Sequence, residues 1–69
     1  MIYTQLRAFH AVAAASSFTK AADALHVTQP TLSAQVKALE EAYGVELFER
    51  RGRGIAPTEL GRRLQEITR

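Results

Sequence analysis

The sequence predicts a mainly α-helical domain with one small β-hairpin, and three observations support this prediction. Apolar residues recur at spacings of three and four in four separate stretches, which is the period of helices that bury one face. Glycine and arginine residues separate two short apolar runs near residues 47–57, as in a hairpin. The chain has 69 residues, enough for one small domain.

Two helices are expected in the N-terminal part of the chain, separated by Ser16-Ser17. The first is expected to bury one apolar face, formed by Ile2, Leu6, Phe9 and Ala13. The second is expected to be short and to begin at Thr19, whose hydroxyl can accept from a free backbone N–H. Its buried face is expected to consist of Ala21, Ala22 and Leu25, where the small alanines allow another helix to approach closely.

A third helix is expected from Gln29 to Tyr43, after a three-residue turn. His26 tolerates the left-handed conformation at the end of the second helix, and Val27 is expected to point back into the core. Thr28 caps the third helix, Pro30 fits its first turn, and Gly44 ends it. The core-facing residues are expected to be Leu32, Val36, Leu39 and Tyr43.

The C-terminal part is expected to form the hairpin and a fourth helix. Val45, Leu47 and Phe48 have strand-like composition, the segment 50–54 is expected to turn, and residues 55–57 return as a second strand. Thr58 is expected to cap the last helix, whose apolar residues are Leu60, Leu64 and Ile67. That stripe looks unfinished at the end of the chain, which suggests the first part of something longer.

The predicted fold is a winged helix-turn-helix followed by the start of a linker helix. The helix-turn-helix covers about residues 18–37 and the wing about residues 47–57, within a domain of residues 1–58. Residues 59–69 are expected to begin a linker or dimerisation helix.

Composition excludes several classes of protein. The chain has no cysteine, which excludes a disulfide scaffold and a thiolate metal site, and its two histidines show no metal-ligand spacing. No apolar stretch approaches the roughly 18 residues of a membrane span, and no signal peptide is recognisable, so a cytoplasmic protein is expected. No nucleophile, carboxylate pair or phosphate-binding loop has usable spacing, so no catalytic residue and no enzyme activity are expected.

Charge is distributed unevenly along the chain. Residues 1–48 carry three basic and four acidic residues, a net charge of −1, whereas residues 49–69 carry six arginines and three glutamates, a net charge of +3. Arg50, Arg51 and Arg53 fall within four positions beside glycines. A solvated charged loop is the simpler interpretation, and a polyanionic partner is the sharper one.

The exposed start of the third helix carries short hydrogen-bonding side chains in place of long charged ones. They include Gln29, Pro30, Thr31, Ser33, Ala34 and Lys37. Such a surface can enter a DNA major groove, where Gln pairs with adenine and Ser or Thr bonds to either donors or acceptors. A plain capped helix start is the alternative, but the turn, the alanine-lined helix and the basic hairpin occur in the order expected for DNA binding.

The segment "FTKAADALHVTQPTLSAQVKALEEAYGVELFERRGRG" followed by "PTELG" resembles the N-terminal domain of the LysR-type transcriptional regulators. The resemblance covers about residues 6–61 and is most specific at Ala21-Ala22, at "TQPTLS", at "LE" and at "GVELFER". It implies a bacterial regulator that binds double-stranded promoter DNA with dyad symmetry and forms a homodimer or tetramer at full length. This fragment is expected to be monomeric or weakly dimeric. No cofactor is expected in this chain, since a small-molecule inducer would bind a C-terminal domain that the chain lacks.

Carried over by position, the resemblance and the helix geometry give a set of expected DNA-binding residues. Gln29, Pro30, Thr31 and Ser33 would face the bases, and Lys37 and Thr19 the backbone, while Thr28 and Gln35 complete the set on the same helix start. Arg50 and Arg53 would make the wing contacts. One residue departs from the pattern, because relatives often have arginine where this chain has Ala34.

One further interpretation remains for comparison. A winged helix that binds protein through its hairpin or fourth helix would not need DNA, and the arginine-rich wing argues against it. Several residues have ordinary structural interpretations: His10 as partly buried or surface, Tyr43 as the core edge, Tyr3 as surface or phosphate contact, and Glu40 and Glu41 on a solvated face.

Overall fold

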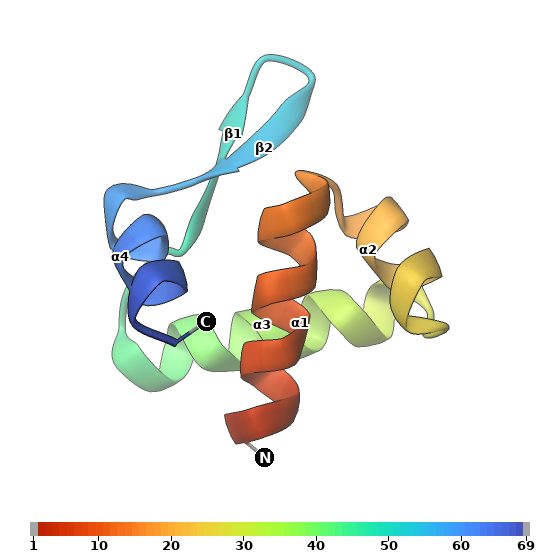
Figure 1. Cartoon of the computed structure of the whole chain (residues 1–69), viewed down its shortest axis with the longest axis horizontal. Helices are drawn as coiled ribbons and strands as arrows, with labels where there is room; N and C mark the ends of the chain where they lie inside the picture. Colours follow the sequence, from red (N-terminus) through yellow and green to blue (C-terminus); the bar gives the residue numbers. More distant parts are fainter. Residues whose placement is uncertain (1, 69) are drawn as a thin grey trace.

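The computed structural model describes residues 2–68 and contains, within that range, four helices and one antiparallel hairpin. In chain order these are α1 (Ile2–Ala15), α2 (Phe18–Leu25), α3 (Gln29–Tyr43), β1 (Phe48–Arg51), β2 (Gly54–Pro57) and α4 (Glu59–Thr68). Figure 1 shows α1 crossing α3, with α2 and α4 on opposite sides of α1 and the hairpin extending beyond its C-terminal end. The predicted winged helix-turn-helix architecture is confirmed.

The first core cluster holds α1, α2 and α3 together. Its fully buried members are Ala8, Val12, Ala21, Ala22, Leu32 and Val36. Three of these six are alanines, which lets the helix backbones approach closely while α1 packs on both of its neighbours. Val27, in the turn after α2, packs against the same cluster, as predicted.

A second cluster joins α1 and α3 to the C-terminal elements. It consists of buried Phe9, Leu39 and Leu47, with Leu64 of α4 packed against it. The Phe48 ring lies 5.3 Å from the Phe9 ring and 5.9 Å from the Phe18 ring, measured between centroids. The base of the hairpin is therefore held by aromatic contacts to both α1 and α2.

The buried surface of α1 is broader than the single predicted stripe. Phe9 is fully buried and Leu6 packs against the second cluster, but Ala8 and Val12 are also fully buried and Ala13 is only half-buried. The reason is that α1 faces α2 as well as α3. The side chain of Ile2, together with Met1 and Arg69, lies outside the described residues.

The hairpin turn is tighter than the predicted segment 50–54. Arg51 pairs with Gly54 and Arg50 with Ile55, so only Gly52 and Arg53 form the loop between the two strands. Gly52 has φ +59°, which a two-residue hairpin loop favours and glycine adopts without strain. Val45 and Leu47, predicted as strand, precede β1.

The fourth helix begins where predicted and sits very close to the segment before the hairpin. The Gly61 backbone N–H donates to the Thr58 hydroxyl at 3.0 Å, which is the predicted cap. A side-chain carbon at Gly61 would collide with the Leu47 carbonyl oxygen, so only glycine fits there. Leu60 and Ile67 are 51% and 80% exposed, which leaves two of the three residues of the predicted stripe uncovered.

Candidate nucleic-acid interface

The turn between α2 and α3 fixes how the third helix begins. His26 adopts the left-handed conformation at φ 58°, and its backbone N–H donates to the carbonyls of Ala22 and Asp23. The Val27 N–H donates to the Ala22 carbonyl at 3.0 Å. Thr28 then caps α3 by accepting from the Thr31 backbone N–H at 3.3 Å, so the predicted turn and cap are both confirmed.

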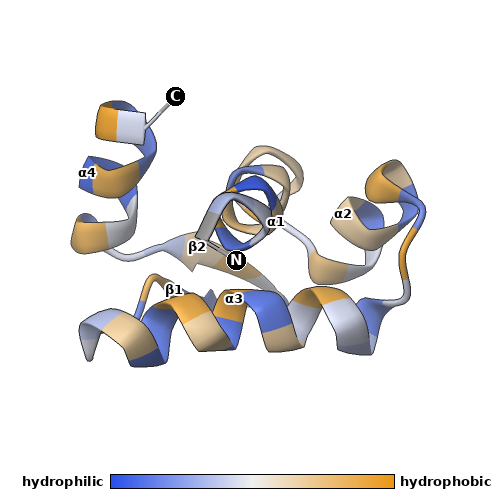
Figure 2. Ribbon diagram, turned by 90° about the horizontal axis from the view of Figure 1, so that it is seen from below, coloured by the Kyte–Doolittle hydropathy of each residue, from blue (hydrophilic) through white to orange (hydrophobic). Residues whose placement is uncertain are grey.

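Helix α3 is buried on one side only. Leu32, Val36 and Leu39 are at most 2% exposed and fix the helix against α1. In Figure 2 the helices α1, α2 and α4 all lie on the same side of α3. The outer side of α3 is therefore the surface from which a partner could be reached.

The predicted base-facing residues lie largely on this outer side. Thr28, Gln29, Pro30, Thr31 and Ala34 are exposed, as is Lys37 one turn further along. Ser33 and Gln35 are half-buried, so their side chains are less accessible than that of Gln29. The structure thus brings most of the predicted DNA-binding residues of α3 to its outer side, near the start of the helix.

Two side-chain hydrogen bonds order this surface. The Thr28 hydroxyl donates to the Thr31 hydroxyl at 2.8 Å. The Gln29 amide Nε2 donates to the Ser33 hydroxyl at 2.6 Å, one helical turn away. These bonds leave the Gln29 carbonyl and the Thr31 hydroxyl proton available to another molecule.

The wing presents its arginines to solvent. Arg53 lies in the two-residue loop and Arg50 in β1, and both are exposed. Arg51 instead pairs with Glu49, with 2.9 Å between the guanidinium nitrogen and the carboxylate oxygen. Of the three neighbouring arginines, Arg50 and Arg53 are the two predicted to contact DNA.

A groove brings the wing arginines to the start of α2. It has a volume of about 660 Å³, and Thr19, Arg50 and Arg53 are among the residues that line it. Ser16 and Ser17 also line it, as do the acidic residues Glu40 and Glu49. Side chains with hydroxyl and guanidinium groups, such as those of Thr19, Arg50 and Arg53, suit a backbone phosphate, which accepts hydrogen bonds from both.

The cap of α2 is Ser17, and the prediction of Thr19 was wrong. The Ser17 hydroxyl accepts from the Lys20 backbone N–H at 3.1 Å, and the helix already begins at Phe18. Ser16 has φ 52° and ends α1, so the capping residue of α2 lies two residues earlier in the chain than predicted. Thr19 stays exposed in the first turn of α2 and is one of the residues that line the groove.

Glu40 has a structural role that its sequence position hides. Its carboxylate accepts from the backbone N–H groups of Leu47 at 2.7 Å and Phe48 at 3.4 Å, so the expectation of a solvated Glu40 was wrong. A carboxylate in the C-terminal half of a helix is unfavourable with the helix dipole. That unfavourable placement was the available signal that Glu40 has a partner elsewhere in the fold.

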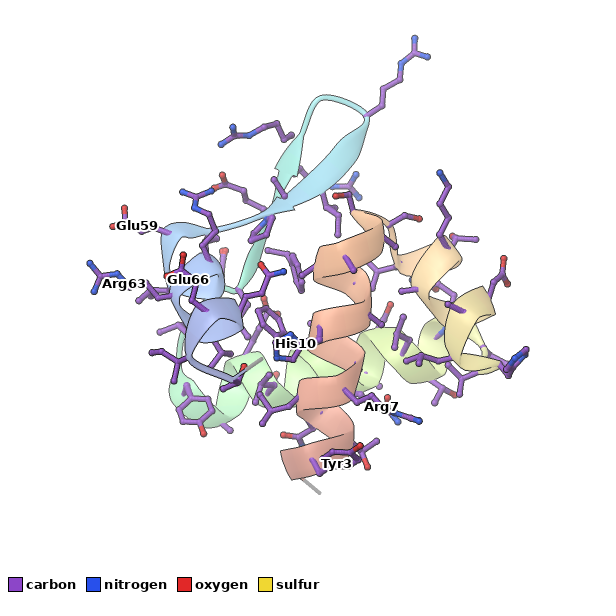
Figure 3. All side chains as sticks on the ribbon, viewed as in Figure 1. Tyr3, Arg7, His10, Glu59, Arg63 and Glu66 are labelled. Carbon is purple, nitrogen blue, oxygen red and sulfur yellow. The ribbon has the colours of Figure 1, made fainter. Side chains whose placement is uncertain are left out.

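The remaining singled-out residues lie away from this surface. Tyr43 is 62% exposed and so does not form the core edge, because α3 turns that residue outward in its last turn. Figure 3 shows His10 directed toward α4, where its Nε2 lies 2.7 Å from the Thr68 hydroxyl, and the predicted partial burial of His10 is confirmed. Tyr3 is 71% exposed, in agreement with a surface position, and its alternative role as a phosphate contact remains a prediction.

Two other kinds of site are not found in the described part of the chain. Residues 2–68 contain no group of three or more His, Cys, Asp or Glu side chains arranged to hold a metal ion. Over the same range, every helix falls short of the length and apolar content that crossing a bilayer requires.

A tight turn, a helix with a polar outer start and an arginine-bearing hairpin together define a winged helix-turn-helix DNA-binding domain. Residues 3–62 match the family described as "Bacterial regulatory helix-turn-helix protein, lysR family". Since this match covers most of the chain, the protein belongs to the LysR family.

Two curated relatives illustrate the similarity in sequence. The RuBisCO operon transcriptional regulator of Allochromatium vinosum is 48% identical over 65 residues, which cover 94% of this chain and 22% of that protein. The HTH-type transcriptional activator CmpR of Synechocystis is 46% identical over 65 residues, covering 94% and 21%. The chain therefore spans about a fifth of the length of these relatives.

Solved structures of the same family have the same fold. The DNA complex of the CbnR DNA-binding domain superposes with a TM-score of 0.90 at 45% identity, covering 97% of this chain and 77% of that one. The complex of the BenM DNA-binding domain with benA site 1 gives 0.86 at 44% identity, covering 91% and 71%. The hydrogen-peroxide-bound C206S mutant of Corynebacterium glutamicum OxyR gives a TM-score of 0.87 at 40% identity, covering 91% of this chain and 20% of that one.

Proposed function

We propose that this domain binds double-stranded promoter DNA in a sequence-specific manner, with the start of α3 in the major groove. The observation that carries the proposal is the polar outer start of α3, where Gln29 and Thr31 are exposed above a buried Leu32. Short side chains let the helix lie deep in the groove, and their amide and hydroxyl groups match base edges. The solved DNA complexes of the BenM and CbnR domains support the choice of DNA as partner.

The wing and the start of α2 would hold the DNA backbone. Arg50, Arg53 and Thr19 line one groove beside the hairpin, which suits phosphate or a narrow minor groove. In this division of labour Gln29, Pro30, Thr31 and Ser33 lie at the bases, with Thr28 and Gln35 beside them. Lys37 and the groove residues supply contacts that do not depend on sequence.

The larger protein would supply the remaining properties. We propose residues 1–58 as the DNA-binding unit and α4 as the start of a linker helix that pairs two copies on a site with dyad symmetry. The inducer would bind elsewhere in the full-length protein, and this domain would need neither cofactor nor catalytic residues. A regulator of this kind acts at the nucleoid, in the cytoplasm.

Selection of bound duplexes from random DNA tests the proposal. We expect an enriched site whose two halves are related by dyad symmetry when the full-length protein is used, and a single half-site with this domain. A parallel selection with Gln29→Ala should lose enrichment at one base pair of each half-site. Equal recovery of all sequences by the wild-type domain would contradict the proposal and would favour a winged helix that binds another protein.

A further inference from the structure

The residue pair Gln29 and Ser33 on the outer face of α3 has a more specific role than two separate base contacts. We infer that Ser33 is a positioning residue, which holds the Gln29 amide in the place from which it reads an adenine and does not itself read a base. The inference rests on the proposed function, since it concerns how α3 would read DNA. It also predicts that the base pair contacted by Gln29 is A·T.

The geometry of the pair supports a positioning role. The Gln29 Nε2 donates to the Ser33 Oγ at 2.6 Å, and the two residues are one helical turn apart on the same face. Gln29 is exposed whereas Ser33 is half-buried. The longer and more accessible side chain is therefore the one placed to reach a partner, and the shorter one lies behind it.

The chemistry of a primary amide makes this bond compatible with base reading. An amide has two N–H donors and one carbonyl acceptor, and a bidentate contact with adenine N6 and N7 uses the carbonyl and one N–H. The second N–H is not needed by the base. Since Ser33 accepts one N–H, Gln29 can keep this bond while its carbonyl and its other N–H meet the adenine.

The same bond fixes where the Gln29 amide lies before DNA is bound. The Ser33 hydroxyl can accept from the amide N–H, as here, or donate to the carbonyl if the amide turns over, so Ser33 sets the position of the amide and the adenine selects its orientation. Gln side chains are also costly to order when they bind. A residue that orders Gln29 before binding should therefore raise both affinity and discrimination at its base pair.

A double-mutant cycle tests the inference on the duplex selected by the wild-type domain and on single base-pair variants of it. Ser33→Ala should weaken binding to the selected duplex by about 2- to 10-fold, which is the cost of ordering one long side chain during binding. It should relax the same base pair as Gln29→Ala and add little in the double variant. Ser33→Thr keeps the hydroxyl and should retain the affinity and the base-pair preference of the wild-type domain.

Alanine favours helices, so Ser33→Ala should leave the fold intact. The inference is overturned if Ser33→Ala relaxes a different base pair from Gln29→Ala, or if its loss is undiminished in the Gln29→Ala background. Either result would make Ser33 an independent base contact.

A measurement on the free protein separates this inference from the proposed function. The side-chain NH₂ signals of Gln29 are identified by their loss in Gln29→Ala. In Ser33→Ala these signals should shift and should report a more mobile Gln29 side chain, whereas in Ser33→Thr they should do neither. Unchanged signals in Ser33→Ala would overturn the inference without any DNA present. A wild-type domain that binds all duplexes equally would overturn the proposed function, and the NMR result would still decide whether Ser33 holds the amide.

Discussion

The carboxylate of Glu40 accepts a hydrogen bond from the backbone N–H of Leu47 across 2.7 Å. This contact joins the C-terminal half of α3 to the segment that leads into the hairpin. The same carboxylate accepts from the Phe48 N–H at 3.4 Å, so both bonds reach the base of β1. The wing is thereby tied to the helix that the proposed function places in the major groove.

Glu40→Ala should lower the free energy of unfolding by about 1–3 kcal/mol, because it leaves a part-buried Leu47 N–H without its charged acceptor. Glu40→Gln retains a carbonyl acceptor and should lose less. Urea denaturation measures both changes. Glu41→Ala is the matched control, since Glu41 is exposed and should change stability by no more than about 0.5 kcal/mol. Equal losses for Glu40→Ala and Glu41→Ala would show that the Leu47 contact contributes nothing.

Gly61→Ala should destabilise the domain by about 1–3 kcal/mol, because the added carbon collides with the backbone of Leu47 and forces α4 to move. An alanine at an unhindered helix position would instead stabilise by about 0.5–1 kcal/mol. The sign of the change in thermal midpoint therefore shows whether the alanine side chain collides with Leu47 or is accommodated. A rise in the midpoint would disprove the close approach of α4 to this carbonyl.

Gln29→Ala should cost about 1–3 kcal/mol of binding free energy at one base pair and relax the preference there. The effect arises because an amide that pairs with one base edge contributes nothing to the others. Fluorescence anisotropy with the selected duplex and with single base-pair variants measures it. The same loss on selected and on random duplexes would contradict a base-reading role for Gln29.

Arg53→Ala should weaken binding to all duplexes alike and lower the slope of log K against log salt by about one. Arg53 is exposed in the hairpin loop, where its charge can neutralise one phosphate. Arg63→Ala removes the same charge from the outer side of α4, where Arg63 faces Glu59 at 3.8 Å (Figure 3). It serves as the charge-matched control and should leave the slope nearly unchanged. A slope altered equally by both variants would assign the effect to net charge alone.

This 69-residue chain should sediment as a monomer or a weak dimer in dilute solution. Leu60 and Ile67 leave apolar surface exposed on α4, but a helix of 10 residues offers little area compared with the roughly 1,200 Å² of a stable interface. Sedimentation velocity over a range of concentrations measures the association. A tight dimer that Ile67→Glu dissociates would refute this prediction and would show that α4 alone suffices for pairing.

Local signals in the sequence were sufficient to predict the helices. Thr28, Pro30 and Gly44 each have a strong preference for one position at a helix end, and the structure places α3 between the predicted bounds. His26 was correctly expected in the left-handed conformation for the same kind of reason. The exposed polar set at the start of α3 follows from the buried stripe, because the two faces of a helix are complementary.

Sequence reasoning missed one local choice between two similar residues and one contact between residues further apart. Two neighbouring hydroxyl residues, Ser17 and Thr19, could each cap α2, and the left-handed Ser16 decides between them. The bonds from Glu40 span seven and eight residues, which no local pattern reveals. The residues expected at the DNA remain predictions, because they require a partner molecule to test them.

The Leu47 peptide has a mechanical consequence. Its N–H is bonded to α3 through Glu40, its carbonyl accepts from the Thr58 N–H at 2.9 Å, and the backbone of Gly61 lies directly against that carbonyl. Helix α4 cannot rotate about its own axis without breaking or displacing these contacts. The Leu47 peptide therefore links α4 directly to α3, and under the proposed function a torque applied to α4 by a larger assembly should be passed to the helix placed in the major groove.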